Sequence, residues 1–311
     1  MNNPWNNIQN GCQIRQDMDV NVYFAKSDNG EYLCKVDLEQ IIERDIELSL
    51  KGIDIRKINK ENSSIIVLIL KTENNWEIFL KLCEDLVTEA KKTQKERAKA
   101  IITRLKRWQV FLQNENHTIP DEIQIGLMGE LIFLNEYLSQ TVSLDEAINA
   151  WVGPEKEKQD FRINGISTEV KAYMDRKQGQ ITISSLEQLN NHDNNLFLFT
   201  VGFKSNDSGK TLKEYCRIIE DRITVECPSC MYDFEQLLSS YGFCLDIEYS
   251  NLKSLASYKI ECYKVTDEFP KIPISIKQNA IINVNYKLDL AQCDNYICDI
   301  KNLINAIKEG I

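Results

Sequence analysis

Residues 159–173 read QDFRINGISTEVKAY, and this stretch decides how the central part of the chain folds. The Asn-Gly pair at 164–165 lies between short segments rich in aromatic and β-branched residues, which is the strongest short signal for a two-residue β-hairpin turn. With this turn, Asp160 lies directly opposite Glu169, and directly opposed side chains share one face of a hairpin. Strand alternation puts Lys171 on that same face. The stretch therefore predicts a hairpin that gathers two carboxylates and an amine.

Two opposed carboxylates repel each other, so the predicted hairpin needs a positive charge between them. Mg²⁺ meets that need, because it binds one or two carboxylates together with water and phosphate oxygens. A neighbouring lysine can orient the attacking water or stabilise charge on a phosphate. The alternative is an exposed hairpin in which Lys171 screens two surface acids. The spacing fits both interpretations equally, and a register shift of one residue would move Asp160 to the opposite face.

A helix predicted for residues 122–138 carries a third acid, Glu130, beside an apolar stripe of leucines. Gly126 and Gly129 allow this helix to approach another backbone closely. If the helix packs across the hairpin, Glu130 reaches the cation as a third acid, often through a water molecule. From the residues alone, an ordinary glutamate at the boundary of the stripe is the preferred interpretation.

The composition limits the classes of partner. The chain has 311 residues, 43% of them hydrophobic, and a formal net charge of −10, so a nucleic-acid partner would have to be met by a local basic patch. The sequence contains no apolar run near the roughly 20 residues of a membrane span. Its first residues are polar rather than signal-like. We therefore expect a cytoplasmic protein without a membrane partner, whose cysteines are mostly reduced and buried.

A lone CPSC motif contains Cys227 and Cys230. A structural zinc site needs two further ligands, and the chain's two histidines, His117 and His192, both lie in polar segments. Cys216 or Cys244 could complete such a site, but no second CxxC motif exists. Ordinary core or loop cysteines are the preferred interpretation, and a histidine-based nucleophile has no support.

Three regions follow one another along the chain. Residues 1–74 are predicted to be β-rich, residues 75–120 to form a helical linker, and residues 121–311 to form a mixed α/β domain with a C-terminal α+β extension. The apolar run at 196–203 is typical of a central strand buried on both faces. Residues 91–107 contain eight basic residues and one acid, Glu96, which indicates either a solvated helix face or a strip that faces phosphates.

Several motifs in a fixed order resemble the PD-(D/E)XK, or restriction-endonuclease-like, superfamily. The closest resemblance is to the bacterial family catalogued as "PD-(D/E)XK motif protein", a domain of unknown function. The motifs cover roughly residues 125–290 and read GLMGELIFL, AWVGPEKEKQDF, TEVKAY, ISSLEQL, EFPKIPISI and NVNYKLDL. The resemblance implies an α/β fold, with a restriction-endonuclease-like core of a mixed central sheet flanked by helices and a β-rich N-terminal region.

The resemblance also implies a Mg²⁺ site, for which Mn²⁺ would substitute. By this carry-over Asp160 and Glu169 are the metal ligands, joined by the backbone carbonyl of Val170. Lys171 is the catalytic lysine, and Glu130 is the accessory acid, which reaches the metal through water. The superfamily's name-giving proline is absent, because the aspartate follows a glutamine, but proline supplies no ligand.

The function expected from this resemblance is a Mg²⁺-dependent DNA endonuclease of a prokaryotic restriction or anti-phage defence system. DNA is then the main partner, and ATPase or methyltransferase subunits of the same system are further partners. A homodimer would supply the two sites that two-stranded cutting needs. The alternative is a DNA-binding or scaffolding subunit that does not cleave alone, which the charge of −10 favours. An unrelated α/β protein with accidental matches is the third option.

Three residues near the motifs have structural explanations as well as functional ones. Ser185, with Gln188 three residues later, forms a capping-box pattern at a predicted helix start. The alternative is a contact with phosphate at that helix end. Trp151 is interpreted as a core aromatic residue rather than one that stacks on a base.

Overall fold

A computed structural model describes most of the chain, and the chain divides into two compact units, Met1–Asn116 and His117–Ile311. Each unit has its own sheet and its own core. The described residues are 3–17, 19–41, 48–92, 97–113, 118–153, 157–190, 195–245, 248–274, 281 and 283–310.

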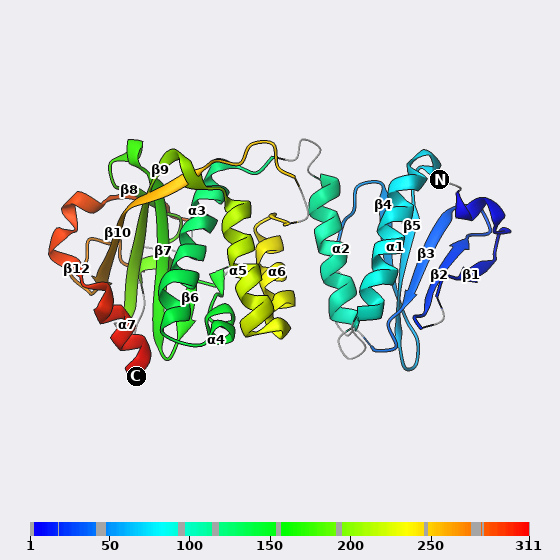
Figure 1. The fold of residues 1–311 in the computed structure, drawn as a ribbon, viewed down its shortest axis with the longest axis horizontal. Helices are drawn as coiled ribbons and strands as arrows, with labels where there is room; N and C mark the ends of the chain where they lie inside the picture. The colour runs from blue at the N-terminus through cyan, green and yellow to red at the C-terminus, as the bar shows by residue number, and fades with distance from the viewer. Residues whose placement is uncertain are drawn as a thin grey trace. The chain divides into compact units, whose positions relative to one another are not determined.

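The first unit contains a five-stranded antiparallel sheet (Figure 1). A hairpin around Asn29 and Gly30 joins its second and third strands, and Gly30 has a positive φ of 86° that the turn requires. The β-rich prediction for this region is thus confirmed by five strands. In spatial order they are β1 (Gln13–Arg15), β2 (Val22–Lys26), β3 (Tyr32–Asp37), β5 (Ser64–Leu70) and β4 (Ile53–Asn59).

Two helices, α1 (Trp76–Lys92) and α2 (Arg97–Gln113), complete the first unit. Their apolar residues, among them Phe79, Leu86 and Ile101, share one buried cluster with residues of the sheet. The helices expected as a linker over residues 75–120 therefore belong to the core of the first unit. The reason is that each helix presents an apolar face, which is stable only when it is packed against another element.

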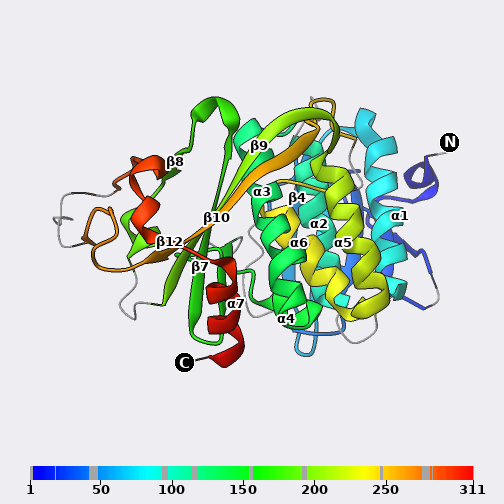
Figure 2. The same ribbon diagram turned by 60° about the vertical axis from the view of Figure 1, so that its left-hand side comes forward.

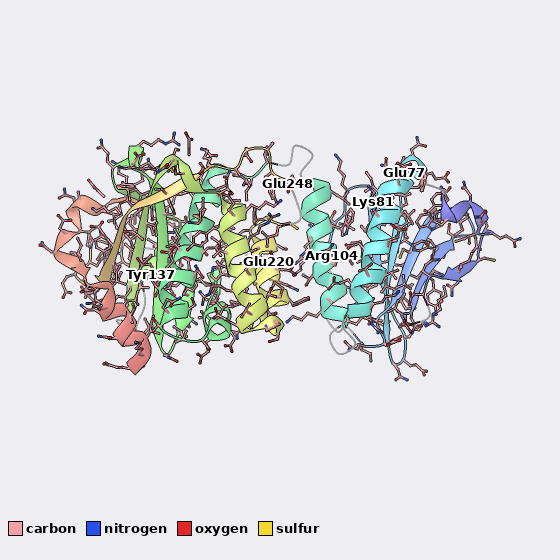
Figure 3. All side chains as sticks on the ribbon, viewed as in Figure 1. Glu77, Lys81, Arg104, Tyr137, Glu220 and Glu248 are labelled. Atoms are coloured by element: carbon pink, nitrogen blue, oxygen red, sulfur yellow. The ribbon has the colours of Figure 1, made fainter. Side chains whose placement is uncertain are left out.

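Part of the basic segment 91–107 is paired with acids of the same unit. Lys91 forms an ion pair with Asp17, and the guanidinium of Arg97 donates to Glu39 at 2.6 Å. Arg104 on α2, labelled in Figure 3, donates to Asp85 of α1. These three cations therefore stabilise the unit internally. Residues 93–96 of the segment lie outside the described residues.

The second unit is built on a five-stranded mixed sheet in the order β12–β10–β9–β7–β6 (Figure 1). Strand β9 is central, and residues 196–203 within it are all buried, so the prediction of a central strand is confirmed. β7 and β9 run parallel, while the other neighbours are antiparallel. The strands are β6 (Phe161–Ile163), β7 (Ile166–Met174), β9 (Leu196–Lys210), β10 (Leu255–Val265) and β12 (Ile297–Cys298).

Helices cover one face of this sheet. α3 (Asp121–Ile132) contacts β7 directly, α5 (Leu212–Glu226) contacts α3, and α6 (Met231–Ser240) contacts α5 (Figures 1 and 2). α3 continues through a π-helical turn (Phe133–Tyr137) and a 3₁₀ turn (Leu138–Gln140), and the short helix α4 (Leu144–Asn149) follows. A mixed sheet flanked by helices is the fold class expected from the sequence, and it is confirmed.

A small two-stranded sheet, β8 (Gln180–Ile183) with β11 (Tyr286–Asp289), contributes to a separate buried cluster. The cluster joins Ile181 and Leu288 of the small sheet to Leu198 of β9 and Tyr263 of β10. Leu198 pairs with Glu169 in β7, and directly paired strand residues share a face. The small sheet therefore packs on the face of the main sheet that carries Glu169.

The helix predicted to begin at Ser185 differs from the structure. After β8 the chain forms only a 3₁₀ turn (Leu186–Leu189), in which Ser185 makes no capping hydrogen bond. The amide of Ser184 instead donates to the Gln188 side chain at 2.8 Å. The C-terminal helix α7 spans Ile300–Glu309, and Asp299 caps its start.

None of the helices in the described part of the chain combines the length and apolar character that crossing a membrane requires.

Candidate functional site

The predicted hairpin forms with the predicted register. Phe161 of β6 pairs with Thr168 of β7, and the turn residues Asn164 and Gly165 have φ values of 50° and 80°. Two consecutive positive φ angles define a type I′ turn, which asparagine followed by glycine adopts most readily. β6 begins at Phe161, so Asp160 lies directly before the strand, next to the edge of β7.

Asp160 is held in place by backbone groups on two sides. Its carbonyl accepts the amides of Val152 and Gly153, each at 2.9 Å. Its carboxylate oxygen Oδ2 accepts the amide of Val170 at 2.7 Å. A Cβ atom on Gly153 would lie 2.8 Å from the other carboxylate oxygen, Oδ1. Glycine at this position therefore allows the close approach that orients the aspartate.

The same hydrogen bond indicates where the carbonyl of Val170 points. In a β-strand, the N–H and C=O groups of one residue are directed to the same side, as in a hydrogen-bonded pair of an antiparallel ladder. Because the Val170 amide donates to Asp160, its carbonyl oxygen faces the same edge of β7. The prediction that this carbonyl could serve as a ligand is compatible with that direction.

Glu169 is completely buried, and Lys171 lies against it. The side chain of Glu169 is 0% exposed, and its Oε1 is 2.7 Å from Nζ of Lys171, whose own side chain is 15% exposed. The two groups are at ion-pair distance, but their geometry is not that of a hydrogen bond, and neither carboxylate oxygen of Glu169 has a hydrogen-bond partner. The interpretation of the hairpin as a pair of exposed surface acids is therefore wrong.

Glu130 approaches from the other face of β7. Helix α3 contacts β7 at Gly129, where a Cβ atom would lie 2.9 Å from Cβ of Ala172. Because side chains alternate along a strand, Ala172 faces α3 while Glu169 and Lys171 face the opposite side. Of the two glycines singled out in the sequence, only Gly129 is needed for this contact, since a Cβ on Gly126 would meet no atom within 4 Å.

Two donors occupy the carboxylate of Glu130. Its Oε2 accepts the indole N–H of Trp151 at 2.6 Å and the hydroxyl of Tyr241 at 2.5 Å. Trp151 is 1% exposed and stacks on Phe161, so the prediction of a core aromatic residue is confirmed. Hydrogen bonds from Trp151 and Tyr241 therefore hold the Glu130 carboxylate in place.

The three acids influence one another electrostatically. Burial raises the pKa of Glu169 to about 8, with a further contribution from the charge of Asp160. Burial also raises the pKa of Asp160, although Lys171 and the Val170 amide oppose this change. The pKa of Glu130 is raised by burial and then by the nearby Asp160. The structure thus brings all three predicted acids within electrostatic range of each other.

Lys171 stays positively charged in this setting. Burial on its own would lower the pKa of its amine, but the attraction of Glu169 and Asp160 is larger in sum and raises it. The ammonium form of Lys171 can stabilise negative charge that develops nearby.

The donor set fits a hard divalent cation. Glu169 offers two buried oxygens without hydrogen bonds, and Asp160 adds an oriented carboxylate. Oxygen ligands of this kind suit Mg²⁺, which completes its coordination with water and substrate phosphates. Within the described residues, no three His, Cys, Asp or Glu side chains converge as a ready metal cluster. The protein would therefore supply two carboxylates and a carbonyl rather than a full cage.

The CPSC cysteines lie elsewhere in the second unit. Cys230 is buried and Cys227 is partly exposed, and the pKa of Cys227 is raised to about 12 by burial and then by its neighbour Cys230. In the part of the chain that the structure describes, no third ligand joins them. His117 and His192 lie outside the described residues.

Two positioning residues were not found from the sequence. Gln159, which replaces the name-giving proline, is 3% exposed and donates to the carbonyl of Glu187 at 2.9 Å. It therefore ties the approach to β6 to the turn after β8. Tyr241, at the end of α6, orients Glu130 across 111 residues of sequence. No local pattern signals either contact, because both partners are distant in the chain.

A mixed sheet with Asp160 before a hairpin strand, Glu169 and Lys171 on the next strand, and Glu130 on the adjoining helix defines a protein of the PD-(D/E)XK class. The family model described as "Putative PD-(D/E)XK family member, (DUF4420)" matches residues 1–291. The chain belongs to this family, so the resemblance seen in the sequence motifs is confirmed. Membership places the chain among nuclease-like proteins, a class whose members typically use divalent metals.

Other comparisons return no relatives. No curated protein matches the chain, and no solved structure matches it.

Proposed function

We propose that this protein is a Mg²⁺-dependent DNA endonuclease of a prokaryotic restriction or anti-phage defence system. The observation that carries the proposal is the carboxylate of Glu169, which is fully buried, lacks hydrogen bonds and lies beside the ammonium of Lys171. Burying a carboxylate is costly even beside one ammonium, because its oxygens lose the hydrogen bonds that they make to water. A cation at this position offsets that cost and is also what phosphodiester hydrolysis requires.

Asp160 and Glu169 would hold the cation, with the carbonyl of Val170 on the same edge and Glu130 acting through water. When bound, the cation supplies Lewis-acid charge stabilisation and a lowered pKa of water. Mn²⁺ has a similar preference for oxygen ligands and would substitute for Mg²⁺.

The chain's own residues supply the remaining requirements. The Val170 amide fixes the Asp160 carboxylate, so that no reorganisation is needed when substrate binds. Lys171 keeps its positive charge, and its partial exposure lets the ammonium contact a phosphate oxygen or orient a water molecule. Hydrogen bonds from Trp151 and Tyr241 keep the Glu130 carboxylate in place on α3.

The proposed partners follow from this chemistry. DNA is the substrate, and an ATPase or methyltransferase of the same defence system would control access to it. A homodimer would allow both strands to be cut, and such a system acts in the cytoplasm. The formal charge of −10 indicates that DNA must be met by a local surface.

A second candidate function is a DNA-binding or scaffolding subunit that does not cleave alone. Two observations favour it: the net charge of −10, and the pairing of Lys91, Arg97 and Arg104 with acids of their own unit. Both reduce the positive surface that an independent nuclease offers to DNA.

Incubation of the pure protein with supercoiled plasmid in Mg²⁺, Mn²⁺ or EDTA tests the first candidate. We expect nicking or linearisation that depends on the metal, and its loss in Asp160→Ala and Lys171→Ala. Asp207→Ala and Lys210→Ala are matched controls, because both side chains are exposed in the same unit. Wild-type-like cleavage by both site variants would refute the assigned site.

Reactions with and without the products of the neighbouring genes separate the two candidates. Cleavage only in the presence of those products, still lost in Asp160→Ala, would place this chain as the nuclease of a complex. Cleavage that survives Asp160→Ala in the complex would support the scaffolding function.

A further inference from the structure

The buried polar atoms without hydrogen bonds share one neighbour, Lys171. Among the described residues, these atoms are the two carboxylate oxygens of Glu169 and the hydroxyl of Tyr286. Leaving a buried polar group without a partner destabilises the folded state, so native structures contain few of them. The proposed cation accounts for the two Glu169 oxygens that lack hydrogen bonds. The hydroxyl of Tyr286 requires a separate explanation, because a neutral phenol donates a hydrogen bond and is not a usual metal ligand.

Tyr286 belongs to the layer that covers the Glu169 face of the sheet. It is the first residue of β11 and pairs with Ile183 of β8. Its ring packs against the cluster that contains Leu198, which lies beside Glu169 in the sheet, and Tyr173, two residues beyond Lys171. Tyr286 therefore approaches the site from the side opposite to α3.

The charges that act on the pKa of Tyr286 agree with this placement. Burial raises the pKa of Tyr286, whereas the backbone amide of Ile272 and the charge of Lys171 both act to lower it. The hydroxyl thus lies within the electrostatic reach of the Lys171 ammonium. The Ile272 amide is directed at the phenol oxygen without forming a hydrogen bond of ordinary geometry. What the hydroxyl lacks is an acceptor for its proton.

The missing acceptor can be identified by its chemistry. Lys171 and Tyr286 are both donors, and two donors converge favourably only on an acceptor with negative charge and more than one lone pair. Glu169 already lies against Lys171, and the proposed cation would occupy its oxygens. A phosphodiester carries non-bridging oxygens that can accept from both donors at once.

We propose that Tyr286 is a substrate-contacting residue whose hydroxyl donates a hydrogen bond to a non-bridging oxygen of the phosphodiester held at Lys171. This inference rests on the proposed nuclease function. It assigns a catalytic part to the C-terminal region of the chain, far in sequence from the hairpin that carries the other site residues. The hydroxyl stabilises charge that develops on the phosphate, as a preorganised oxyanion donor does.

Tyr286→Phe tests the proposal, because it removes only the hydroxyl. Loss of one oxyanion donor lowers kcat about 100-fold. We expect that loss together with a raised KM, because the proposed hydrogen bond also forms to the bound phosphodiester before it reacts. The melting temperature should stay the same or rise, because the deleted hydroxyl has no partner in the folded protein. Far-UV circular dichroism and a thermal melt establish that the variant folds.

Tyr296→Phe is the matched control. Tyr296 packs against the same cluster, but its hydroxyl donates to the carbonyl of Glu268. This variant should lose thermal stability and keep its kcat. An equal loss of stability in Tyr286→Phe would show that the Tyr286 hydroxyl has a structural partner, and would overturn the proposal.

The remaining outcomes separate this inference from the function on which it rests. Wild-type kcat in Tyr286→Phe, with Asp160→Ala inactive, overturns the role of Tyr286 and leaves the nuclease function standing. If the wild type cleaves nothing, either alone or with the products of the neighbouring genes, the nuclease function fails, and binding of a DNA duplex in Ca²⁺ becomes the readout. A dissociation constant at least tenfold weaker in Tyr286→Phe than in Tyr296→Phe then supports the phosphate contact, and equal binding overturns it.

Discussion

The ionisable side chains of this site lie in or beside the protein interior, where burial opposes their charged forms. Glu169 is buried without hydrogen bonds, Asp160 is fixed by a backbone amide, and Lys171 is the cation beside them. Such a cluster lowers the stability of the metal-free protein, because burial disfavours every ionised carboxylate. It therefore indicates a site kept for function rather than for stability.

The pKa of Glu169 predicts how metal-free stability depends on pH. The pKa is about 8 in the folded protein against 4.5 for an unperturbed glutamate, so the folded state binds the extra proton between these values. The contribution to stability is full below about pH 4.5 and is lost as pH rises through about 8. We expect the free energy of unfolding in EDTA to fall by a few kcal/mol over this window.

Glu169→Gln should flatten that profile, because the amide does not titrate. Denaturant unfolding at pH 5 and pH 8 measures the effect, and Asp207→Ala, at an exposed acid, should keep the wild-type slope. Identical slopes in wild type and Glu169→Gln would mean that this carboxylate is not perturbed.

At the scale of elements, the contact between α3 and β7 sets the position of the site. Gly129 is the point of closest approach, with Ala172 on the strand. The contact leaves Glu169 and Lys171 on the opposite face of β7 and brings Glu130 to Trp151 and Tyr241. Movement of α3 would therefore shift Glu130 relative to Asp160.

Gly129→Ala tests this contact against Gly126→Ala on the same helix. The first substitution forces a Cβ atom to within 2.9 Å of Ala172, and overpacking of this kind costs about 1–3 kcal/mol. The second meets no atom within 4 Å and should stabilise the helix by up to about 1 kcal/mol. Thermal melts of both variants measure the difference, and equal effects would contradict the packing described for α3.

Some elements follow from local sequence and others do not. The hairpin register follows from one Asn-Gly pair, because only one turn type accepts two positive φ angles at these residues. The buried run of β9 follows from continuous apolar composition. The face of β7 that α3 covers, and the donors to Glu130, depend on contacts between residues far apart in sequence, and no local pattern encodes them.

At the scale of the whole molecule, each unit has its own sheet and core. The helices predicted as a linker instead complete the first unit, because periodicity identifies a helix but not the surface that its apolar face meets. The four side chains of the predicted site, and Tyr286 as well, all belong to the second unit. The proposed chemistry therefore belongs to the second unit.

The central claim is that the edge of β7 holds a divalent cation between Asp160 and Glu169. Anomalous diffraction from crystals grown with Mn²⁺ tests it most directly, with Glu169→Gln crystals as the control. We predict one strong peak bounded by the two carboxylates and the Val170 carbonyl in the wild type, and no peak in the variant. Mn²⁺-containing wild-type crystals without density between these groups would contradict the account.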